Sequence, residues 1–126
     1  MHWAEQYIGR QYTKGTYDCA SLVVEVQREV FGRNIPDYGE RPPMRSDEAQ
    51  VLEAEVRRLT IRIDDPVEGC AVQMRSAGSI HHLGVYCEVN GEPHVLHNVR
   101  RMGTILTKLR DLHKFSMQIE GFYQWL

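Results

Sequence analysis

The chain has 126 residues, of which 42% are hydrophobic and 25% are charged, and its formal net charge at pH 7 is −2. These values predict one soluble globular domain over residues 1–126, long enough to build a core without disulfides. They argue against a nucleic-acid-binding protein, because the sequence contains no basic run. No stretch approaches the roughly 20 apolar residues that span a bilayer, and no secretory signal is visible, so we expect synthesis in the cytoplasm without membrane insertion.

Helical patterns fill the N-terminal half of the chain. Residues 2–8 predict a short helix that Gly9 ends. Apolar residues at helical spacing predict a second helix over residues 18–31, in which Val24 lies off the apolar stripe and indicates burial on more than one side. A proline-rich loop over residues 33–46 follows, which we expect beside the cleft, and a third helix is predicted from its end to about residue 59.

Strand patterns fill the C-terminal half of the chain. Short runs of β-type residues predict strands over residues 70–75, 81–89 and 94–99, with a closing strand within residues 115–126. The Asn90-Gly91 pair predicts a tight hairpin turn between the second and third of these strands. Helices followed by an antiparallel sheet predict an α+β domain.

The three cysteines, Cys19, Cys70 and Cys87, lie far apart in the sequence, and their odd number does not form a disulfide framework. Cys70 and Cys87 fall in apolar strands and are expected in the core. Cys19 stands where a polar turn gives way to a helix, with Asp18 as the expected cap. A helix N-terminus favours the thiolate, the nucleophilic form of cysteine, although burial is the commoner role of a free cysteine.

Two histidines on neighbouring predicted strands make a nucleophilic role for Cys19 plausible, because a thiol needs an imidazole base and a group that orients it. Alternation along the strand places His82 on one face with Gly84, whose missing side chain is expected to leave room for a substrate. Across the hairpin, His97 is positioned to reach His82 and fix its tautomer. We therefore expect the Cys19 sulfur within about 4 Å of a ring nitrogen of His82.

A zinc-binding module is an alternative, because two strands can present several ligands. The candidate ligands would be Cys87, His81, His82, His94 and His97. Their spacings match no familiar zinc pattern, and alternation divides them between two faces of the sheet. We therefore expect no metal and no cofactor, and we expect His94 at the surface.

Four short motifs resemble those of the NlpC/P60 cysteine peptidases, and they occur in the same order. The segment "DCASL" at residues 18–22 resembles the family's "DCSGL", and "HLGVY" at 82–86 resembles "HVGIY". The segment "LHN" at 96–98 is similar to "IHA", and "GRQY" at 9–12 is similar to "GxPY". The chain departs from the family at Ala20, Ser21 and Cys70. These departures leave in place the residues that match the family's catalytic triad, which are Cys19, His82 and His97.

The resemblance implies a papain-like fold, in which N-terminal helices pack on a central antiparallel sheet. It implies that Cys19 is the nucleophile, His82 the general base and His97 the residue that orients His82. Tyr12 and the backbone N–H of Cys19 would stabilise the oxyanion. Asp18 would help to bind the free amino end of the substrate.

The resemblance also implies a function: cleavage of an amide bond in peptidoglycan stem peptides, expected at the γ-D-glutamyl link to the diamino residue. The short chain is most similar to the phage and prophage tail-associated subgroup. We therefore expect it on a tail tip or related particle, docked through an apolar patch that includes the C-terminal "GFYQWL". Two alternatives stay open: a structural component of a tail-like particle with little or no hydrolase activity, and an amidase or acyltransferase that uses the same thiol.

Overall fold

The structure is a computed structural model that describes residues 2–13, 17–33, 35, 58–76 and 79–126, with side chains left undescribed for residues 79–81. The predicted loop over residues 33–46 and the predicted third helix lie almost entirely outside the described residues. Two further short gaps, at 14–16 and 77–78, interrupt the chain.

The helical part of the described chain begins with the 3-10 helix η1 (Trp3–Tyr7), which is followed by Gly9 in a left-handed conformation with φ of 93°. The α-helix α1 (Cys19–Glu29) starts at the predicted place, because the Asp18 side chain accepts hydrogen bonds from the first-turn N–H groups. Val24 is buried although it lies off the apolar stripe. The expected short helix and the helix beginning at Cys19 are both present.

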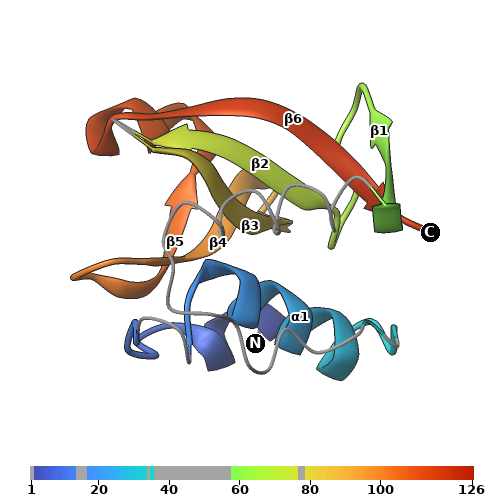
Figure 1. Ribbon diagram of the computed structural model, residues 1–126, viewed down its shortest axis with the longest axis horizontal. Helices are drawn as coiled ribbons and strands as arrows, with labels where there is room; N and C mark the ends of the chain where they lie inside the picture. Colours follow the sequence, from blue (N-terminus) through green and yellow to red (C-terminus); the bar gives the residue numbers. More distant parts are fainter. Residues whose placement is uncertain (1, 14–16, 34, 36–57, 77–78) are drawn as a thin grey trace.

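Six strands form one sheet with the order β1-β6-β2-β3-β4-β5, and every neighbouring pair is antiparallel (Figure 1). The strands are β1 (Thr60–Ile63), β2 (Ala71–Ser76), β3 (Ser79–Val89), β4 (Glu92–Val99), β5 (Gly103–Lys108) and β6 (Met117–Trp125). A second 3-10 helix, η2 (Leu109–Phe115), connects β5 to β6. The predicted turn between β3 and β4 is present, with positive φ at Asn90 and Gly91.

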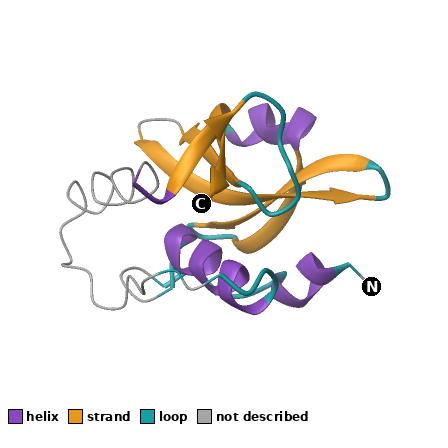
Figure 2. Ribbon diagram, turned by 90° about the vertical axis from the view of Figure 1, so that its right-hand side faces the viewer, coloured by secondary structure: helices purple, strands orange, loops and turns teal. Residues whose placement is uncertain are grey.

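Both faces of the sheet are covered, as Figure 2 shows: α1 and η1 pack on one face and η2 on the other. The α1-side core contains Ala4, Tyr7, Ala20, Leu22, Val23, Val24, Val26, Ile35, Ala71, Leu83, Val85, Cys87, Leu96, Tyr123 and Trp125. The η2-side core contains Cys70, Val72, Met74, Tyr86, Val95, Leu112 and Met117. Strand β3 thus contributes alternate residues to the two cores, as a strand buried on both faces must.

The predicted papain-like α+β fold is wrong. The described chain is a mainly β structure, built on a six-stranded antiparallel sheet, and α1 is the one α-helix whose bounds lie within the described residues. Sequence patterns under-counted the strands, because β1 and β5 are short and show no simple alternation of buried and exposed residues. No helix of the described part is long and apolar enough to cross a membrane.

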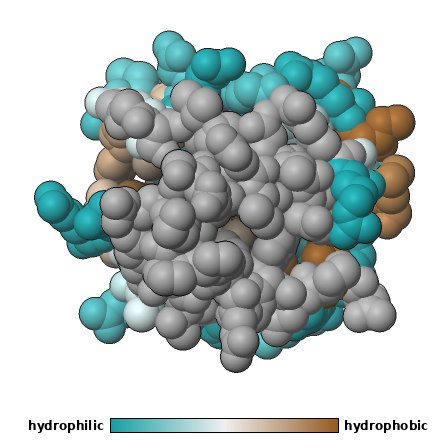
Figure 3. Space-filling model, viewed as in Figure 1, coloured by the Kyte–Doolittle hydropathy of each residue, from teal (hydrophilic) through white to brown (hydrophobic). Residues whose placement is uncertain are grey.

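The C-terminal segment is mostly interior, which corrects the expectation that "GFYQWL" forms a docking patch. Tyr123 and Trp125 are 8% and 7% exposed and belong to the α1-side core. Leu126 is exposed, as is Ile61 on the neighbouring β1. Figure 3 shows apolar surface at the edge where Figure 1 places β1 and the C-terminus, and it forms a small area.

The segment after η1 is tied to the far edge of the sheet. Gly9 N–H donates to the Thr104 carbonyl at 2.9 Å, and Thr104 N–H donates to the Arg10 carbonyl at 2.8 Å. The Asn98 side chain also donates to the Arg10 carbonyl, at 3.3 Å. A Cβ at Gly103 would lie 2.7 Å from that same carbonyl oxygen, so the close approach of the two segments requires glycine there.

Candidate active site

The two central strands of the sheet separate at the site. Pairing between β3 and β4 runs from Val89↔Glu92 at the turn to Val85↔Leu96. Beyond that point β3 stays paired with β2 as far as Ser79, while β4 stays paired with β5 as far as Val99↔Gly103. In Figure 1 the β2–β3 and β4–β5 pairs diverge on the left. We call this region, residues 79–84 of β3 and 97–99 of β4, the open end of the hairpin.

Two imidazole rings bridge the open end. His82 Nε2 lies 2.7 Å from His97 Nδ1, and His97 Nε2 lies 2.9 Å from the hydroxyl oxygen of Thr107 on β5. The rings of the two histidines meet edge to face, with centroids 5.0 Å apart. The predicted contact between His82 and His97 is therefore present. It uses Nε2 of His82 and leaves Nδ1 outside the pair.

Burial keeps both rings neutral at neutral pH. His97 is fully buried and His82 partly so. Burial lowers the pKa of His82 to about 4. Burial, and secondarily the neighbouring His82, lower the pKa of His97 well below its usual range. A buried cation would lose hydration without gaining a carboxylate partner among the described residues, so the neutral forms are favoured.

Gly84 serves the histidine pair and not a substrate, which corrects the sequence-based expectation. A Cβ on Gly84 would lie 2.5 Å from Cγ2 of Val95 and 3.1 Å from Cβ of His97. The space that the glycine leaves is therefore filled by β4. It lets His97 pack closely against β3 at the level where the strands separate.

Cys19 is the first residue of α1 and is partly exposed. The Asp18 carboxylate accepts hydrogen bonds from Ala20 N–H and Ser21 N–H, both at 3.1 Å. It also accepts one from the Ser21 hydroxyl, at 3.2 Å. Asp18 thus fixes the first turn of α1 and the position of the thiol, and its expected role in binding an amino group stays a prediction.

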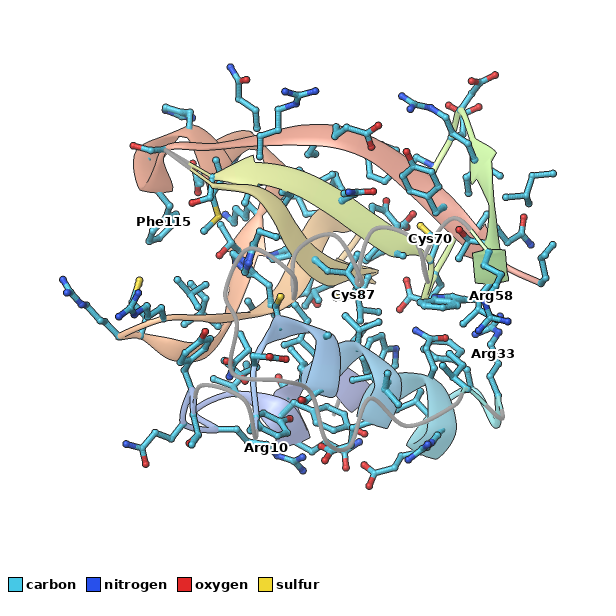
Figure 4. All side chains as sticks on the ribbon, in the orientation of Figure 1. Arg10, Arg33, Arg58, Cys70, Cys87 and Phe115 are labelled. Carbon is cyan, nitrogen blue, oxygen red and sulfur yellow. The ribbon has the colours of Figure 1, made fainter. Side chains whose placement is uncertain are left out.

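The other two cysteines have the opposite environment. Both are buried, and burial raises the pKa of Cys70 to about 11 and that of Cys87 to about 12. Figure 4 shows Cys87 between the sheet and α1, as expected for a core thiol. Because a thiolate is the nucleophilic form of cysteine, these two residues are inert at neutral pH, and Cys19 is the one cysteine that is not buried.

The alignment of α1 with β3 is set by one buried amide. Gln27 is fully buried and donates to the Gly69 carbonyl at 2.9 Å, while Gly69 N–H donates to the Tyr86 carbonyl at 2.8 Å. This places the C-terminal half of α1 at the level of Tyr86, and α1 and β3 run in broadly the same direction in Figure 1.

Element geometry then relates Cys19 to His82. From Gln27 back to Cys19, eight residues of helix span about 12 Å. From Tyr86 back to His82, four residues of strand span about 13 Å. The N-terminus of α1 therefore lies near the level of His82 along β3. His82 pairs with Met74 and alternates with Leu83, so its side chain starts from the η2 side of the sheet, whereas α1 packs on the other side. The direct contact between the Cys19 thiol and Nδ1 of His82 stays a prediction.

Tyr12, the predicted oxyanion donor, is partly exposed and follows the segment that is tied to Thr104 and Asn98. A pair of backbone hydrogen bonds, both 2.7 Å, joins Thr13 to Tyr17, two residues before α1 begins. Tyr12 therefore lies between Arg10, which is hydrogen-bonded to Asn98 of β4 and Thr104 of β5, and the start of α1. Its oxyanion role stays a prediction.

The alternative zinc set is not assembled in the described part of the chain, where no three His, Cys, Asp or Glu side chains are grouped to hold a metal ion. Cys87 packs in the α1-side core, and the side chain of His81 lies outside the described residues. His94 was expected at the surface, but it is buried, and its Nδ1 lies 2.8 Å from the Glu92 carbonyl.

Sequence reasoning missed Thr107 because it missed β5. The signal was present in "GTILTK", a run with three β-branched residues that follows a turn after β4. Had residues 103–108 been predicted as a strand paired with residues 94–99, Thr107 would have been expected near His97. Comparison with known proteins adds no functional assignment: neither a protein-family model nor a curated protein matches the chain.

Proposed function

We propose that the protein is a cysteine hydrolase that cleaves an amide bond, with Cys19 as nucleophile and His82 as general base. The observation that carries this proposal is the hydrogen-bonded row from His82 through His97 to Thr107. Cys19, the one cysteine that is not buried, is the first residue of the helix that packs on the same hairpin. A catalytic thiol needs an imidazole that is oriented by a second group through one ring nitrogen and can accept the thiol proton at the other. In His82, Nε2 contacts His97, and Nδ1 is the nitrogen left for the thiol.

The mechanism follows from the neutral state of the rings. His82 Nδ1 takes the thiol proton as Cys19 Sγ bonds to the amide carbonyl carbon, and the carbonyl oxygen becomes an oxyanion. The C–N bond then breaks, and His82 returns the proton to the leaving amine, which leaves a thioester on Cys19. Water, deprotonated by His82, attacks the thioester, releases the carboxylic acid product and restores the thiol.

The lowered pKa of His82 supports a neutral base and not a preformed ion pair. With a pKa of about 4, the imidazole is uncharged at neutral pH, so one of its ring nitrogens holds a lone pair. His97 is equally neutral, so it orients His82 through a hydrogen bond and adds no charge.

The substrate class rests on the sequence. The motifs around Cys19, His82 and His97 resemble those of NlpC/P60 peptidases, and we propose peptidoglycan stem peptides as substrates, with the γ-D-glutamyl link to the diamino residue as the bond cut. The same resemblance supports a place on a phage-type tail tip. Tail-like particles purified from a producing strain would contain this chain, and its absence from them would remove the second proposal.

The experiment is digestion of purified peptidoglycan and of defined tri- and tetrapeptides, followed by mass analysis of the products. The wild-type chain should release the fragments expected for the γ-D-glutamyl cut, and Cys19→Ala should release none. Cys87→Ala is the matched control, because it removes a thiol from the core and leaves the open end unchanged.

Other outcomes have defined meanings. Normal hydrolysis by Cys19→Ala would overturn the enzymatic proposal. A product in which the acyl group is joined to an added amine would identify an acyltransferase that uses the same thiol. A folded wild-type chain that neither cuts nor transfers would favour a structural role.

A further inference from the structure

We propose that Thr107 is a positioning residue: by accepting a hydrogen bond from His97 Nε2, its hydroxyl makes possible the tautomer of the histidine pair that leaves His82 Nδ1 as a base, a tautomer that a side chain without an acceptor would disfavour. The inference deepens the proposed function and rests on it. Thr107 is 6% exposed and lies on β5, directly beside β4, in register with Val95.

The contact between the two rings allows two arrangements. A neutral imidazole carries one N–H and one lone pair, so a single hydrogen lies between His82 Nε2 and His97 Nδ1, which are 2.7 Å apart. If His97 donates, neutral His82 carries its proton on Nδ1 and cannot accept one from a thiol. If His82 donates, its Nδ1 holds the lone pair that the chemistry needs.

We call the arrangement in which His82 donates the active one and the other the inactive one. In the active arrangement, His97 Nε2 needs a hydrogen-bond acceptor. With His97 Nδ1 accepting, the proton of His97 is on Nε2 and must be donated. The hydroxyl oxygen of Thr107, 2.9 Å away, is the acceptor for it. His97 is fully buried, so water has no access with which to replace that acceptor.

Removing the hydroxyl therefore favours the inactive arrangement. Thr107→Val would leave a buried N–H of His97 without an acceptor in the active arrangement, but only an unpaired lone pair in the inactive one. Orphaned N–H groups are the rarer and costlier defect. The pair should then reverse, and His82 should carry its proton on Nδ1.

The test compares Thr107→Val, Thr107→Ser and the control Thr104→Val. Thr104 is a buried threonine on the same strand, and its hydroxyl accepts from the Asn98 side chain at 2.9 Å instead of from an imidazole. The readouts are the ring ¹⁵N shifts of His82 and His97, which report the tautomers, and kcat and KM on a stem tetrapeptide.

Thr107→Val should lower kcat on the order of 10- to 100-fold, the size of effect seen when the group behind an oriented imidazole is lost, with KM little changed. Its His82 should shift to the Nδ1–H tautomer. Thr107→Ser should restore both readouts, and Thr104→Val should alter neither. An unchanged tautomer and kcat in Thr107→Val would overturn the inference, as would an equal loss of kcat in Thr104→Val.

Two further results decide the inference even if a variant does not fold or the wild-type chain is inactive. The wild-type chain alone must show His82 protonated on Nε2, and the Nδ1–H tautomer there would overturn the inference even if Thr107→Val does not fold. If the wild-type chain has no hydrolase activity, the proposed function fails, while the ¹⁵N shifts still decide whether Thr107 sets the tautomer.

Discussion

The two ends of the β3–β4 hairpin use histidine in opposite ways. At the turn end, residues 85–89 and 92–96 form an unbroken ladder, and His94 there contacts the backbone carbonyl of Glu92. At the open end the ladder has stopped, and His97, three residues further along the same strand, contacts His82 and Thr107 instead. Side-chain hydrogen bonds across the gap replace the backbone pairs that the strands give up.

The comparison shows how one strand holds both a histidine that contacts the backbone and a histidine that contacts a second imidazole. A buried imidazole that bonds to a backbone carbonyl is held in place by the fold, but this bond does not affect the tautomer of another ring. A buried imidazole that bonds to a second imidazole determines where the proton of that second ring lies. The position of strand separation, and not the residue type, distinguishes the two histidines of β4.

The largest expected effect comes from replacing one histidine at each end. His82→Ala should lower kcat by about 10²- to 10⁴-fold, the usual contribution of a general base. His94→Ala should leave kcat nearly unchanged and act on stability alone. Turnover of a stem tetrapeptide, with circular dichroism as a check on folding, measures both. Equal losses of activity would show that the two ends do not differ as described.

A second pair of substitutions compares glycines. Gly84→Ala, at the open end, places a methyl group against Val95 and the Leu96 carbonyl, and we expect a loss of about 2–3 kcal/mol in the free energy of unfolding. Gly91→Ala, in the turn, meets no atom within 4 Å, but its φ of 77° costs about 1 kcal/mol. Urea unfolding measures both, and a larger loss at Gly91 would contradict the packing described for the open end.

The pH dependence of stability tests the burial of the histidine pair. The pKa of His82 is about 4 in the folded chain and about 6.5 in the unfolded chain, so between these values the unfolded chain binds more protons. Stability should therefore be fully present above pH 6.5 and fall as the pH drops towards 4, by about 2–3 kcal/mol for this group. The lowered pKa of His97 acts in the same direction. His82→Gln should flatten the slope, and an unchanged slope would argue against a buried neutral ring.

The smallest expected effect concerns the start of α1. Asp18→Ala removes the cap and should cost about 1 kcal/mol of stability, while Asp18→Asn, a good cap residue, should cost only a few tenths. If Asp18 also binds an amino group of the substrate, Asp18→Asn should raise KM for peptides with a free amino end and not for blocked ones. Equal KM values for both peptides would leave the carboxylate with the capping role alone.

The features that sequence predicted well depend on short-range signals. Asp18 before a helical pattern fixed the start of α1, and Asn90-Gly91 fixed the hairpin, so the meeting of His82 and His97 followed from counting residues across the turn. These predictions needed only local preferences and strand alternation. The catalytic roles assigned to Cys19 and the two histidines stay predictions.

The features that sequence missed depend on long-range packing. β5 has buried Gly103, Thr104 and Thr107 with partly buried residues between them, so no alternation marks it as a strand. Without β5 there was no Thr107 in the predicted site. The separation of β3 from β4 left no local signal, because it results from each strand keeping a different outer partner. The fold class failed for the same reason, since strands were under-counted.

The carbonyl of Arg10, which accepts from Thr104 N–H and the Asn98 side chain, has a consequence for the order of folding. The β3–β4–β5 meander joins neighbours in sequence and closes short loops, whereas this contact closes a loop of roughly 90 residues and costs more chain entropy. During synthesis, Cys19 is made long before Asn98 and Thr104, the residues of β4 and β5 that bind the Arg10 carbonyl. We expect Cys19, the proposed nucleophile, to come near the two imidazoles only after β5 has been made, so that a shorter chain would carry the thiol without its proposed base.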